Sequence, residues 1–595
     1  MDEIMNLKSI PYGVSDFADF TKYNLYYVDK TSFIRNIEKK GKFLFFIRPR
    51  RFGKSLFLSM LEYYYDISQK DRFKLLFHKT DILKNPTPEH NSYFILKFNF
   101  SETDPDITSI KESFTIYIKE TTISFIAKYE KYLNIDAKAA QAEINIRNTA
   151  SDALRVFLNY CSGIKQKLYV IIDEYDNFAN TILSTSGEDV FKNITHGEGF
   201  LRSFFNMIKA GTTGSDTPIS RLFMTGVSPI TLDDVTSGFN IATNVTMDSD
   251  IHEILGFTHP EVETLINYYR QTGKFNHTTE ELIGLMTHWY NHYRFSPFAS
   301  DELFNTSQVL YFMDKYMIDS HIPIKLIDYN ARIDYNKLRH LVIIDKKGKP
   351  ETNGNFLKLQ KAMESEDIIT SIEPSFPIQQ LGEPDNFYSL LFYFGLLTIK
   401  GLTASQKTIL TIPNEFAKNL YYEYIKSVWA ETDRFKIDMN AFSNLIDNMA
   451  FKGIWIEAIE YIAERMEKSL GIRDLFDREK ALQVFWNVYF GLNPLYIVYS
   501  EKELNQGFAD LVMMPMLTQF PGILYSYLIE FKYIKPADYK KEGNEEKIES
   551  LRIEAETQLN KYSKDERFIK SIGQTTLKKL VIIFSGNKMV YRGEA

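Results

Sequence analysis

Apolar residues in the first half of the chain gather in short unbroken runs, each followed by a polar turn. The run from Phe43 to Ile47 precedes a compact basic turn, and Leu56 to Tyr65 then carry apolar side chains at helical spacing. A run that is apolar at every position is typical of a parallel strand buried on both faces. Further segments of strand character are Tyr93 to Ser101, Leu168 to Ile172 and Arg221 to Ile230. The pattern predicts an α/β domain built on a parallel sheet.

The turn after the first strand ends like a phosphate-binding loop. Such a loop needs a buried strand, a tight turn with inward N–H groups and a helix whose N-terminus faces the anion. The pattern G-x-x-x-x-G-K-[ST] is met at its end by Gly53, Lys54 and Ser55, while Arg48 stands at the first glycine position. We expect Lys54 to reach the β- and γ-phosphates of a nucleotide and Ser55 to ligate Mg²⁺. The alternative is a solvated basic loop before a helix.

An acidic pair, Asp173 and Glu174, directly follows the buried strand Leu168 to Ile172. The carboxyl ends of strands are where α/β sheets bind ligands. Asp173 is expected to hold Mg²⁺ and Glu174 to orient the attacking water. Thr225 ends another strand beside the expected γ-phosphate, although a plain polar strand end is the alternative. The predicted nucleotide-binding residues are Arg48, Pro49, Arg50, Arg51, Phe52, Gly53, Lys54, Ser55, Asp173 and Thr225.

From about residue 258 the pattern becomes mostly helical, with aromatic-rich amphipathic stretches. Residues 388–425 predict a helix, a short hairpin and a second helix, which resembles a winged-helix arrangement. Winged helices bind DNA, but in signalling ATPases they also pack between domains, so both roles stay open. A linker is predicted near residues 426–440.

The last part of the chain contains a second group of charged residues at strand spacing. Glu530 and Lys532 are two apart in a predicted strand and project from one face, and Asp510 precedes the apolar pair of an earlier strand. This is the spacing of an Asp…Glu-x-Lys nuclease core, in which two carboxylates hold Mg²⁺ against the scissile phosphate. The lysine then positions water or stabilises charge. The alternative is a solvated ion-pair face.

Three further residues are candidates for the same site. Gln558 and Tyr562 are four apart on a predicted helix and so share a face, in the order that this nuclease core uses. A third acid from the first helix of this fold often helps to hold the metal, and Glu479 is the candidate.

The length, charge and cysteine content of the chain exclude some classes of protein. A chain of 595 residues needs two to four domains, and a net charge of −7 argues against a uniformly basic nucleic-acid binder. The single cysteine, Cys161, excludes an intramolecular disulfide and is predicted to be a core residue. No signal peptide and no apolar run of membrane-spanning length is evident, so we expect a cytoplasmic protein without a membrane partner.

The runs "YYVDKTSFI", "RPRRFGKS", "VIIDEYD", "TGVSPI", "SGFNIA" and "LGFTHPEV" resemble the bacterial AAA-ATPase-like family. Its members usually carry a C-terminal PD-(D/E)XK nuclease-like domain. The family shares the arginine at position 48. In "WYNHYRFSP" Asn291 and His292 replace the family's aspartate and glycine, whereas Arg294 is kept. Phe508 stands where the family commonly has arginine.

The resemblance implies a multidomain α/β protein. Its parts are a P-loop AAA-like ATPase domain (1–257), a helical lid with a possible winged-helix region (258–440) and a PD-(D/E)XK, restriction-endonuclease-like domain (441–595). The expected cofactors are ATP and Mg²⁺, with Mn²⁺ possible at the nuclease site, and the expected partner is DNA.

The expected function is a protein that acts on DNA, with the nucleotide state gating a deoxyribonuclease. The alternative is a nucleotide-switched signalling or scaffold ATPase whose last domain binds nucleic acid or protein without cutting. A DNA-translocating oligomer would need an arginine in trans, for which Arg202 and Arg221 are candidates.

Overall fold

The computed structural model separates the chain into two compact units. The first comprises residues 1–346, 353–355 and 367–414, and the second comprises 347–352, 356–366 and 415–595. The structure describes residues 7–595 except 103–105, 107–108, 163, 165–166, 187, 198, 215–216, 231–240, 332–353, 365–366, 432–434, 469–478, 506 and 541–543.

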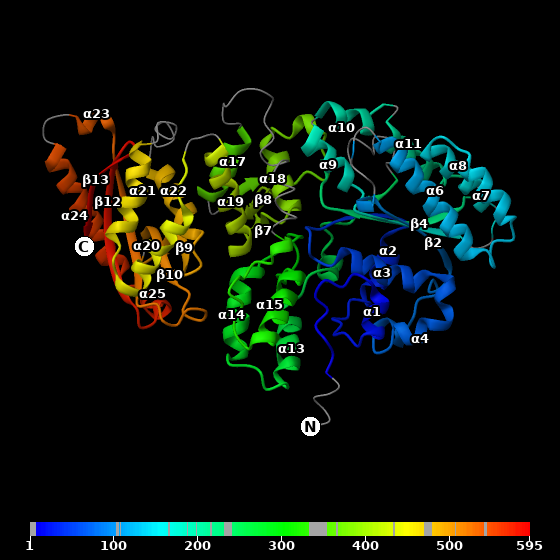
Figure 1. Ribbon diagram of the computed structural model, residues 1–595, viewed down its shortest axis with the longest axis horizontal. Helices are drawn as coiled ribbons and strands as arrows, with labels where there is room; N and C mark the ends of the chain where they lie inside the picture. The colour runs from blue at the N-terminus through cyan, green and yellow to red at the C-terminus, as the bar shows by residue number, and fades with distance from the viewer. Residues whose placement is uncertain are drawn as a thin grey trace. The chain divides into compact units, whose positions relative to one another are not determined.

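The first unit is built on a five-stranded parallel sheet with the strand order β2-β3-β4-β1-β5 (Figure 1). In chain order the strands are β1 (Phe43–Ile47), β2 (Tyr93–Asn99), β3 (Lys167–Asp173), β4 (Ile219–Gly226) and β5 (Thr243–Asn244). Strands β1, β3 and β4 are buried along nearly their whole length, which explains their unbroken apolar runs. Since β4 lies between β1 and β3, the carboxyl ends of these three strands adjoin at one edge of the sheet.

Helices cover both faces of this sheet. The helices before and between its strands are α1 (Phe17–Lys22), α2 (Phe33–Lys40), α3 (Lys54–Tyr65), α4 (Phe73–Leu76), α5 (Asp81–Lys84), α6 (Ile110–Tyr129), α7 (Ala137–Asn145), α8 (Ala150–Cys161), α9 (Asn177–Ser186), α10 (Glu188–Thr195) and α11 (Phe200–Ala210). Lys97 of β2 reaches Glu62 of α3, whereas the next side chain, Phe98, meets Phe204 of α11 edge-on at 5.3 Å between ring centroids. Successive side chains of a strand point to opposite faces, so α3 and α11 lie on opposite sides of the sheet.

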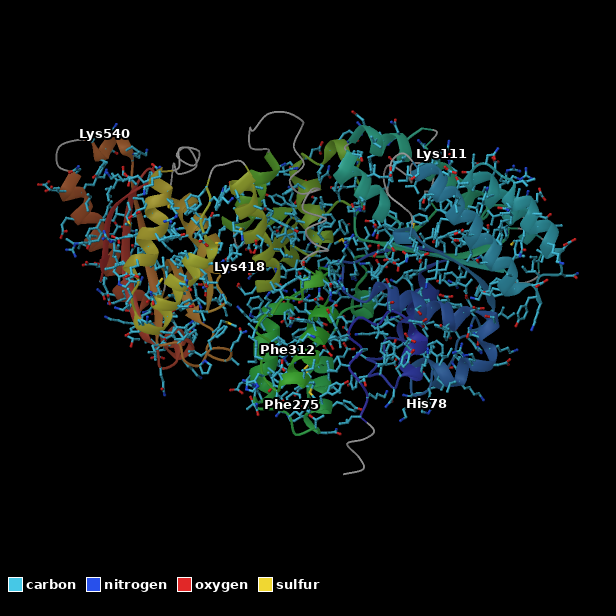
Figure 2. The ribbon with its side chains drawn as sticks, viewed as in Figure 1. His78, Lys111, Phe275, Phe312, Lys418 and Lys540 are labelled. Atoms are coloured by element: carbon cyan, nitrogen blue, oxygen red, sulfur yellow. The ribbon has the colours of Figure 1, made fainter. Side chains whose placement is uncertain are left out.

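The rest of the first unit is mainly helical. It contains α13 (His259–Arg270), α14 (Thr279–Tyr290), α15 (Thr306–Asp319), α18 (Pro384–Tyr393) and an antiparallel sheet of β6 (Ile368–Thr370), β8 (Thr408–Thr411) and β7 (Thr398–Leu402). Helices α13 and α14 each begin with a capping box, in which a threonine and a glutamate three residues later exchange hydrogen bonds. Tyr316 of α15 contacts Phe275 and stacks on Phe312, which are both labelled in Figure 2. Short 3₁₀ helices span Ile67–Arg72, Phe100–Glu102, Ser249–Ile254 and Ile378–Gln380.

The second unit has a five-stranded mixed sheet with the order β13-β12-β11-β10-β9. Its strands are β9 (Tyr496–Leu504), β10 (Gly507–Pro515), β11 (Tyr525–Ile534), β12 (Thr576–Ser585) and β13 (Lys588–Glu594). Only β11 and β12 pair in parallel, and α24 supplies the crossover that a parallel pair requires.

Helices also cover both faces of the second sheet. The helices of this unit are most of α17 (Gly354–Glu364), α19 (Glu415–Glu431), α20 (Met439–Lys452), α21 (Ile456–Lys468), α22 (Glu479–Gly491), α23 (Pro536–Tyr539), α24 (Asn544–Tyr562) and α25 (Glu566–Ile572). Trp486 of α22 stacks on Phe531, whereas Leu559 of α24 belongs to a buried cluster with Leu528. Phe531 and Leu528 point to opposite faces of β11, so α22 and α24 sandwich the sheet.

The predicted fold class is confirmed: a parallel P-loop sheet, a helical middle and a C-terminal α/β domain. Cys161 is buried at the end of α8, as expected, and burial raises the pKa of its thiol to about 12. The compact units divide at Asn414, whereas the predicted boundaries at residues 257 and 440 remain predictions. Residues up to Glu431 of the predicted linker belong to α19. No helix among the described residues combines the length and the apolar character needed to cross a bilayer.

Candidate functional site

The loop between β1 and α3 has the geometry of an anion cradle. Arg51 (φ 69°) and Gly53 (φ 98°) adopt left-handed backbone conformations, which curl the chain into the first turn of α3 at Lys54. A Cβ at Gly53 would meet nothing closer than 4.0 Å, so this position needs glycine for its backbone angle and not for space. The carbonyl of Arg51 accepts a hydrogen bond from the N–H of Ser307 at 3.1 Å, which holds the strained residue in place. The first N–H groups of an α-helix have no acceptor within the helix, so the start of α3 suits an anion such as phosphate.

Lys54 is buried beneath this loop. Its ammonium donates to the main-chain carbonyls of Arg48 and Pro49, both at 2.9 Å. Burial lowers the Lys54 pKa to about 8, against the opposing charges of Asp173 and Glu174. A buried cation hydrogen-bonded to neutral carbonyls favours the arrival of an anion.

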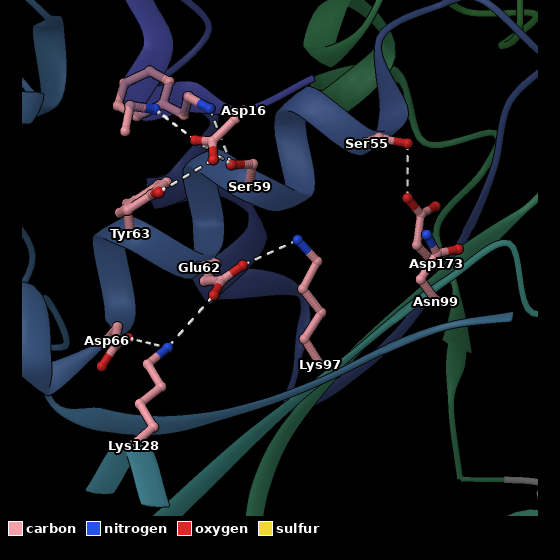
Figure 3. Close-up of polar contacts among 12 residues, drawn as sticks. Asp16, Ser55, Ser59, Glu62, Tyr63, Asp66, Lys97, Asn99, Lys128 and Asp173 are labelled. Carbon is pink, nitrogen blue, oxygen red and sulfur yellow. Dashed lines mark hydrogen bonds and ion pairs between the residues drawn. The ribbon is translucent and has the colours of Figure 1, made fainter. Parts of the chain in front are cut away.

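The expected magnesium ligands meet across the sheet edge. The Ser55 hydroxyl donates to Oδ2 of Asp173 at 2.7 Å (Figure 3). Asp173 ends β3 and is 4% exposed; burial raises the pKa of its carboxyl, and the bond from Ser55 and the charge of Lys54 lower it. A hydroxyl and a carboxylate at hydrogen-bonding distance are hard oxygen ligands of the kind that Mg²⁺ takes, so these residues fit the ion.

Glu174 borders the same place in a left-handed conformation (φ 48°). Its N–H donates to Oδ1 of Asp173 at 2.9 Å, and its carboxylate accepts a hydrogen bond from the side chain of Asn177. The strained turn brings the carboxylates of both acids to the carboxyl end of β3.

A cavity of about 420 Å³ opens beside the phosphate loop. Its volume lies in the range of small-molecule sites. Its polar lining includes Arg50, Arg51, Lys54 and Ser55. Its apolar wall comes from distant segments of the chain and includes Pro11, Val14, Tyr27, Leu255, Phe257 and Leu310. A lining that combines these cationic and hydroxyl groups with apolar side chains suits a nucleotide.

A second cavity, of about 720 Å³, also reaches Ser55, Asp173 and Glu174. Glu62 lies between the ammonium groups of Lys97, at 3.0 Å, and Lys128, at 3.6 Å (Figure 3). Lys128 also pairs with Asp66 at 2.8 Å, so these two lysines are balanced by two acids.

The Arg48 side chain is not part of the phosphate site, and this corrects the prediction. Arg48 is 1% exposed, and its guanidinium lies between the rings of Phe46 and Phe295 at 4.4 and 4.3 Å from the ring centroids. Nη1 donates to the carbonyls of Thr246, at 2.6 Å, and Ile47, at 3.0 Å. Burial lowers the Arg48 pKa to about 9. Only the Arg48 main chain, through its bond from Lys54, belongs to the loop.

The side chains of Pro49 and Phe52 pack against other parts of the first unit. Phe52 meets Tyr293 and Phe295 edge-on at 5.0 and 5.4 Å between ring centroids. Pro49 lies against Gly395, where an added Cβ would come within 2.8 Å of the Pro49 ring. These two side chains anchor the loop to the helical middle of the first unit.

Thr225 requires a second correction. Its hydroxyl is buried and donates its single proton to the carbonyl of Phe46 at 2.7 Å, so it has no proton left for a phosphate in this conformation. Arg221 is likewise unsuited to act in trans, because it is 7% exposed and bound to Glu89 through two guanidinium nitrogens. Arg202 lies on α11.

Asp176 is a residue that the sequence interpretation missed. It is 2% exposed and accepts hydrogen bonds from the N–H groups of Val227 and Ser228 at 3.2 and 2.6 Å. Gly226 must be glycine here, since a Cβ would lie 2.5 Å from the Asp176 carboxylate. Asp176 therefore ties the end of β4 to the turn after β3 that carries the acidic pair. The third acid of the run "DEYD" was the available signal.

The second group of site residues gathers where β10 and β11 part. Their antiparallel ladder ends at the pair Leu511–Ile529, and Asp510 and Glu530 occupy the next facing positions. Facing residues of an antiparallel pair project to the same side, and Lys532 joins them two residues further along β11. All three are buried, with exposures of 7%, 2% and 7% in the order Asp510, Glu530, Lys532.

Each charged group in this cluster has defined contacts. Asp510 accepts from the N–H of Phe531 at 2.8 Å through Oδ2 and from the Gln483 side chain at 2.7 Å through Oδ1. Lys532 lies 3.1 Å from Glu530 and 3.4 Å from Glu554 of α24. The predicted strand geometry is thus reproduced, and the lysine stands beside the acid.

The supporting residues come from two helices. Tyr562 is 5% exposed, and burial and then the charges of Glu530 and Asp510 raise its pKa. Oε1 of Gln558 is buried with no hydrogen-bond partner among the described residues. Glu479 begins α22, but its side chain lies outside the part of the chain that the structure describes. Gln483, one turn further on, is a contact that the sequence interpretation missed.

Asp510 and Glu530 fit a magnesium site of the open kind. Among the described residues no group of three acids, histidines or cysteines could hold a metal. Mg²⁺ is commonly held by one or two carboxylates, with water and substrate phosphate completing its shell. Two buried carboxylates on one face of a sheet meet that requirement.

Comparison with known proteins finds a family match for the first part of the chain and another for the last part. Residues 11–236 match the family model described as predicted AAA-ATPase, and residues 477–594 match that of the PD-(D/E)XK nuclease superfamily, which confirms the resemblance. Over 334 residues the chain is 24% identical to an uncharacterized protein in the vnfD 5′ region of Azotobacter chroococcum mcd 1. This match covers 54% of the chain and 56% of the relative, so the chain spans about half the length of that relative.

Two solved structures are also similar. The Walker-type ATPase PABY2304 of Pyrococcus abyssi is 11% identical with a TM-score of 0.35, over 66% of this chain and 94% of that one. The Aeropyrum pernix ORC1 protein in complex with DNA is 10% identical with a TM-score of 0.24, over 64% and 86%. Both TM-scores are low, so we draw nothing from them about function.

Proposed function

Since the chain joins an AAA-ATPase-like domain to a PD-(D/E)XK nuclease-superfamily domain, we propose that it binds ATP and cuts DNA, with the nucleotide state gating the cut. The observation that carries the proposal is the buried group of Asp510, Glu530 and Lys532 at the point where β10 and β11 part. A plain solvated ion-pair face would leave these charges in water.

The first unit would bind ATP at the phosphate loop. Lys54 would exchange its two carbonyl contacts for the β- and γ-phosphates, and Ser55 with Asp173 would hold Mg²⁺. Bound there, the ion would neutralise charge on the phosphates. Glu174, which lines both cavities, would orient the attacking water.

The second unit would hydrolyse a phosphodiester. Asp510 and Glu530 would hold Mg²⁺ or Mn²⁺, which would stabilise negative charge on the scissile phosphate. Lys532 would position water or stabilise the developing charge. Gln483 and the N–H of Phe531 would keep the Asp510 carboxylate in one orientation.

Gating would begin at the phosphate loop. When Lys54 leaves the carbonyls of Arg48 and Pro49, the main chain of the loop loses two hydrogen bonds. Pro49 touches Gly395, in the corner between α18 and β7, and this part of the chain leads through β8 into α19 of the second unit. A shift of Pro49 would therefore reach the connection between the units.

One observation favours a second candidate function, a nucleotide-switched signalling or scaffold protein that does not cut. Both Asp510 oxygens accept hydrogen bonds from the protein, and Lys532 contacts two carboxylates. A site that satisfies its own charges in this way needs rearrangement before it can act on a substrate.

A DNA cleavage assay with Mg²⁺ or Mn²⁺, with and without ATP, tests the proposal on wild type, Lys532→Ala and Lys54→Ala. Lys578→Ala is the matched control, because Lys578 also forms an ion pair in the same sheet but far along β12. Cleavage that is lost in Lys532→Ala, and whose ATP dependence is lost in Lys54→Ala, supports the gated nuclease. If nothing is cut under any condition while ATP still binds, the second candidate replaces it.

A further inference from the structure

An exposed aromatic side chain lies next to the acids of the second unit. Phe508 is 56% exposed, although the five residues that follow it on β10 are buried. Phe508 and Asp510 are two apart on one strand, so they project from the same face with Cα atoms roughly 7 Å apart. The Tyr562 ring occupies the space that a Cβ at Gly507 would need, and the Tyr562 hydroxyl hydrogen-bonds with the backbone N–H of Phe508. This end of β10 is therefore fixed in position.

Cationic side chains lie at the turn between α24 and α25, here called the basic corner. The basic corner consists of three exposed residues, Lys561, Lys564 and Arg567. Asn505, in the turn before β10, donates from its N–H to Asp565 and from its side-chain amide to the Lys561 carbonyl, both at 3.0 Å. Asp565 is buried in these contacts, which leaves Glu566 as the exposed acid of the turn. The basic corner thus borders the strand end that carries Phe508.

From this arrangement we propose that the acids of the second unit act on an unpaired DNA strand. Phe508 stacks on a base next to the scissile phosphate, and the basic corner binds the backbone. The inference rests on the proposed nuclease function and adds its substrate class.

The chemistry of Phe508 and of the basic corner favours an unpaired DNA strand as the ligand. A phenyl ring has a flat apolar face and no charge, so it stacks on exposed bases and gains nothing from phosphates. In a duplex neighbouring pairs cover the base faces, which leaves Phe508 no partner. An arginine at this position would bind the backbone of single and double strands alike.

The inference is tested by measuring the affinity of the full chain for labelled DNA. The buffer contains a chelator, so that no metal-dependent cleavage occurs during the measurement. The probes are a single strand with 2-aminopurine, the same strand as a blunt duplex, and a duplex with an unpaired end. The variants are Phe508→Ala, Phe508→Trp and the control Phe451→Ala, which removes another exposed ring of the same unit.

We expect Phe508→Ala to bind the single strand and the unpaired end about 5- to 150-fold more weakly, which is the range that stacking on one base contributes. This variant should no longer quench the fluorescence of 2-aminopurine by stacking on it. Its affinity for the blunt duplex should equal that of wild type. Phe508→Trp should retain both signals, and Phe451→Ala should match wild type. Equal binding of the single strand by wild type and Phe508→Ala overturns the inference, as does an equal loss for single strand and duplex.

The results also separate the inference from the proposed function. If wild type cuts DNA in a Lys532-dependent manner but Phe508→Ala behaves like wild type, only the inference fails. If wild type neither binds the probes nor cuts DNA with Mg²⁺ or Mn²⁺ and ATP, both fail. If it cuts DNA but binds none of the probes, only the inference fails. A Lys561→Glu/Lys564→Glu variant should lower the slope of log affinity against log salt by about 0.7 for each phosphate that it no longer binds. An unchanged slope removes the basic corner from the interface.

Discussion

The two candidate sites each contain a buried lysine, but its partners differ in charge. Lys54 of the first unit donates to two neutral carbonyls at 2.9 Å. Lys532 of the second unit lies 3.1 Å from one carboxylate and 3.4 Å from another. The first lysine is a cation hydrogen-bonded to neutral groups, whereas the second is already neutralised by its surroundings.

This difference indicates what each site needs before it can act. A buried cation without a hydrogen-bonded anion is costly, and a phosphate lowers that cost, so the loop of the first unit is ready for an anionic ligand. In the second unit the carboxylates first need a cation other than Lys532 before a phosphate can approach. We therefore expect nucleotide binding in the first unit to depend on one lysine, and cleavage in the second to depend on the carboxylates and the metal together.

The largest effect is expected when Glu530 loses its charge. Glu530→Gln removes the main anionic partner of Lys532 and one of two expected metal ligands, so cleavage should fall by roughly 10²–10³-fold, the scale typical of a lost electrostatic contributor. The apo protein should also unfold more easily, because the buried Lys532 loses the nearer of its two carboxylate contacts. Cleavage rates and thermal unfolding measure the two effects. A stable, fully active Glu530→Gln protein would mean that the cluster is only an ion pair.

Lys54→Met, unlike Glu530→Gln, is expected to lose function without losing stability. Loss of charged hydrogen bonds should weaken ATP binding by about 10–100-fold. The apo protein should unfold no more easily than wild type, because the substitution removes a buried charge and keeps most of the side-chain volume. Calorimetric titration with ATP and thermal unfolding without it are the measurements, and Lys97→Met, in the second cavity, is the control. If Lys54→Met binds ATP normally, the loop is not the nucleotide site.

The sequence predicted the parts of both sites that depend on local chain geometry. Lys54 and Ser55 could be placed because the loop joins a strand directly to a helix. Asp173 could be placed because it ends a buried strand, and parallel strands of one sheet present their carboxyl ends at the same edge. Alternation along β11 placed Glu530 and Lys532 on one face. These relations need only the spacing of residues along the chain.

Contacts set by distant segments were not predictable in this way. Arg48 matches a loop position in the sequence, but its guanidinium is held by Phe295 and Thr246, about 200 and more residues away along the chain. Packing thus turned an expected phosphate ligand into a core residue. Thr225 and Gln483 are similar cases, since a spacing rule gives no direction for a hydroxyl or an amide whose partner lies on another element.

A pH titration sharpens the account of Lys54. Its folded-state pKa of about 8 lies below the ordinary value of 10.5, because burial disfavours the ammonium. ATP binds the ammonium form and raises its pKa, so ATP affinity should be constant below pH 8 and then fall by up to about tenfold per pH unit. The apo protein should gain stability over the same alkaline range, since the unfolded chain then holds a proton that the folded chain has lost. Lys54→Arg should abolish the slope in affinity, and a slope that persists in this variant assigns the titration to another group.

The smallest effect is expected at Glu554, the second carboxylate beside Lys532. Its side chain is 56% exposed and 3.4 Å from the ammonium, and exposed ion pairs of this kind contribute about 0–1 kcal/mol. Glu554→Gln should therefore change the cleavage rate by less than about fivefold and leave the metal requirement intact. Rates measured across a metal titration make the comparison with Glu530→Gln direct. If both variants lose activity to the same extent, Glu554 is itself a metal ligand, and the charge balance around Lys532 belongs to a three-carboxylate site on β10, β11 and α24.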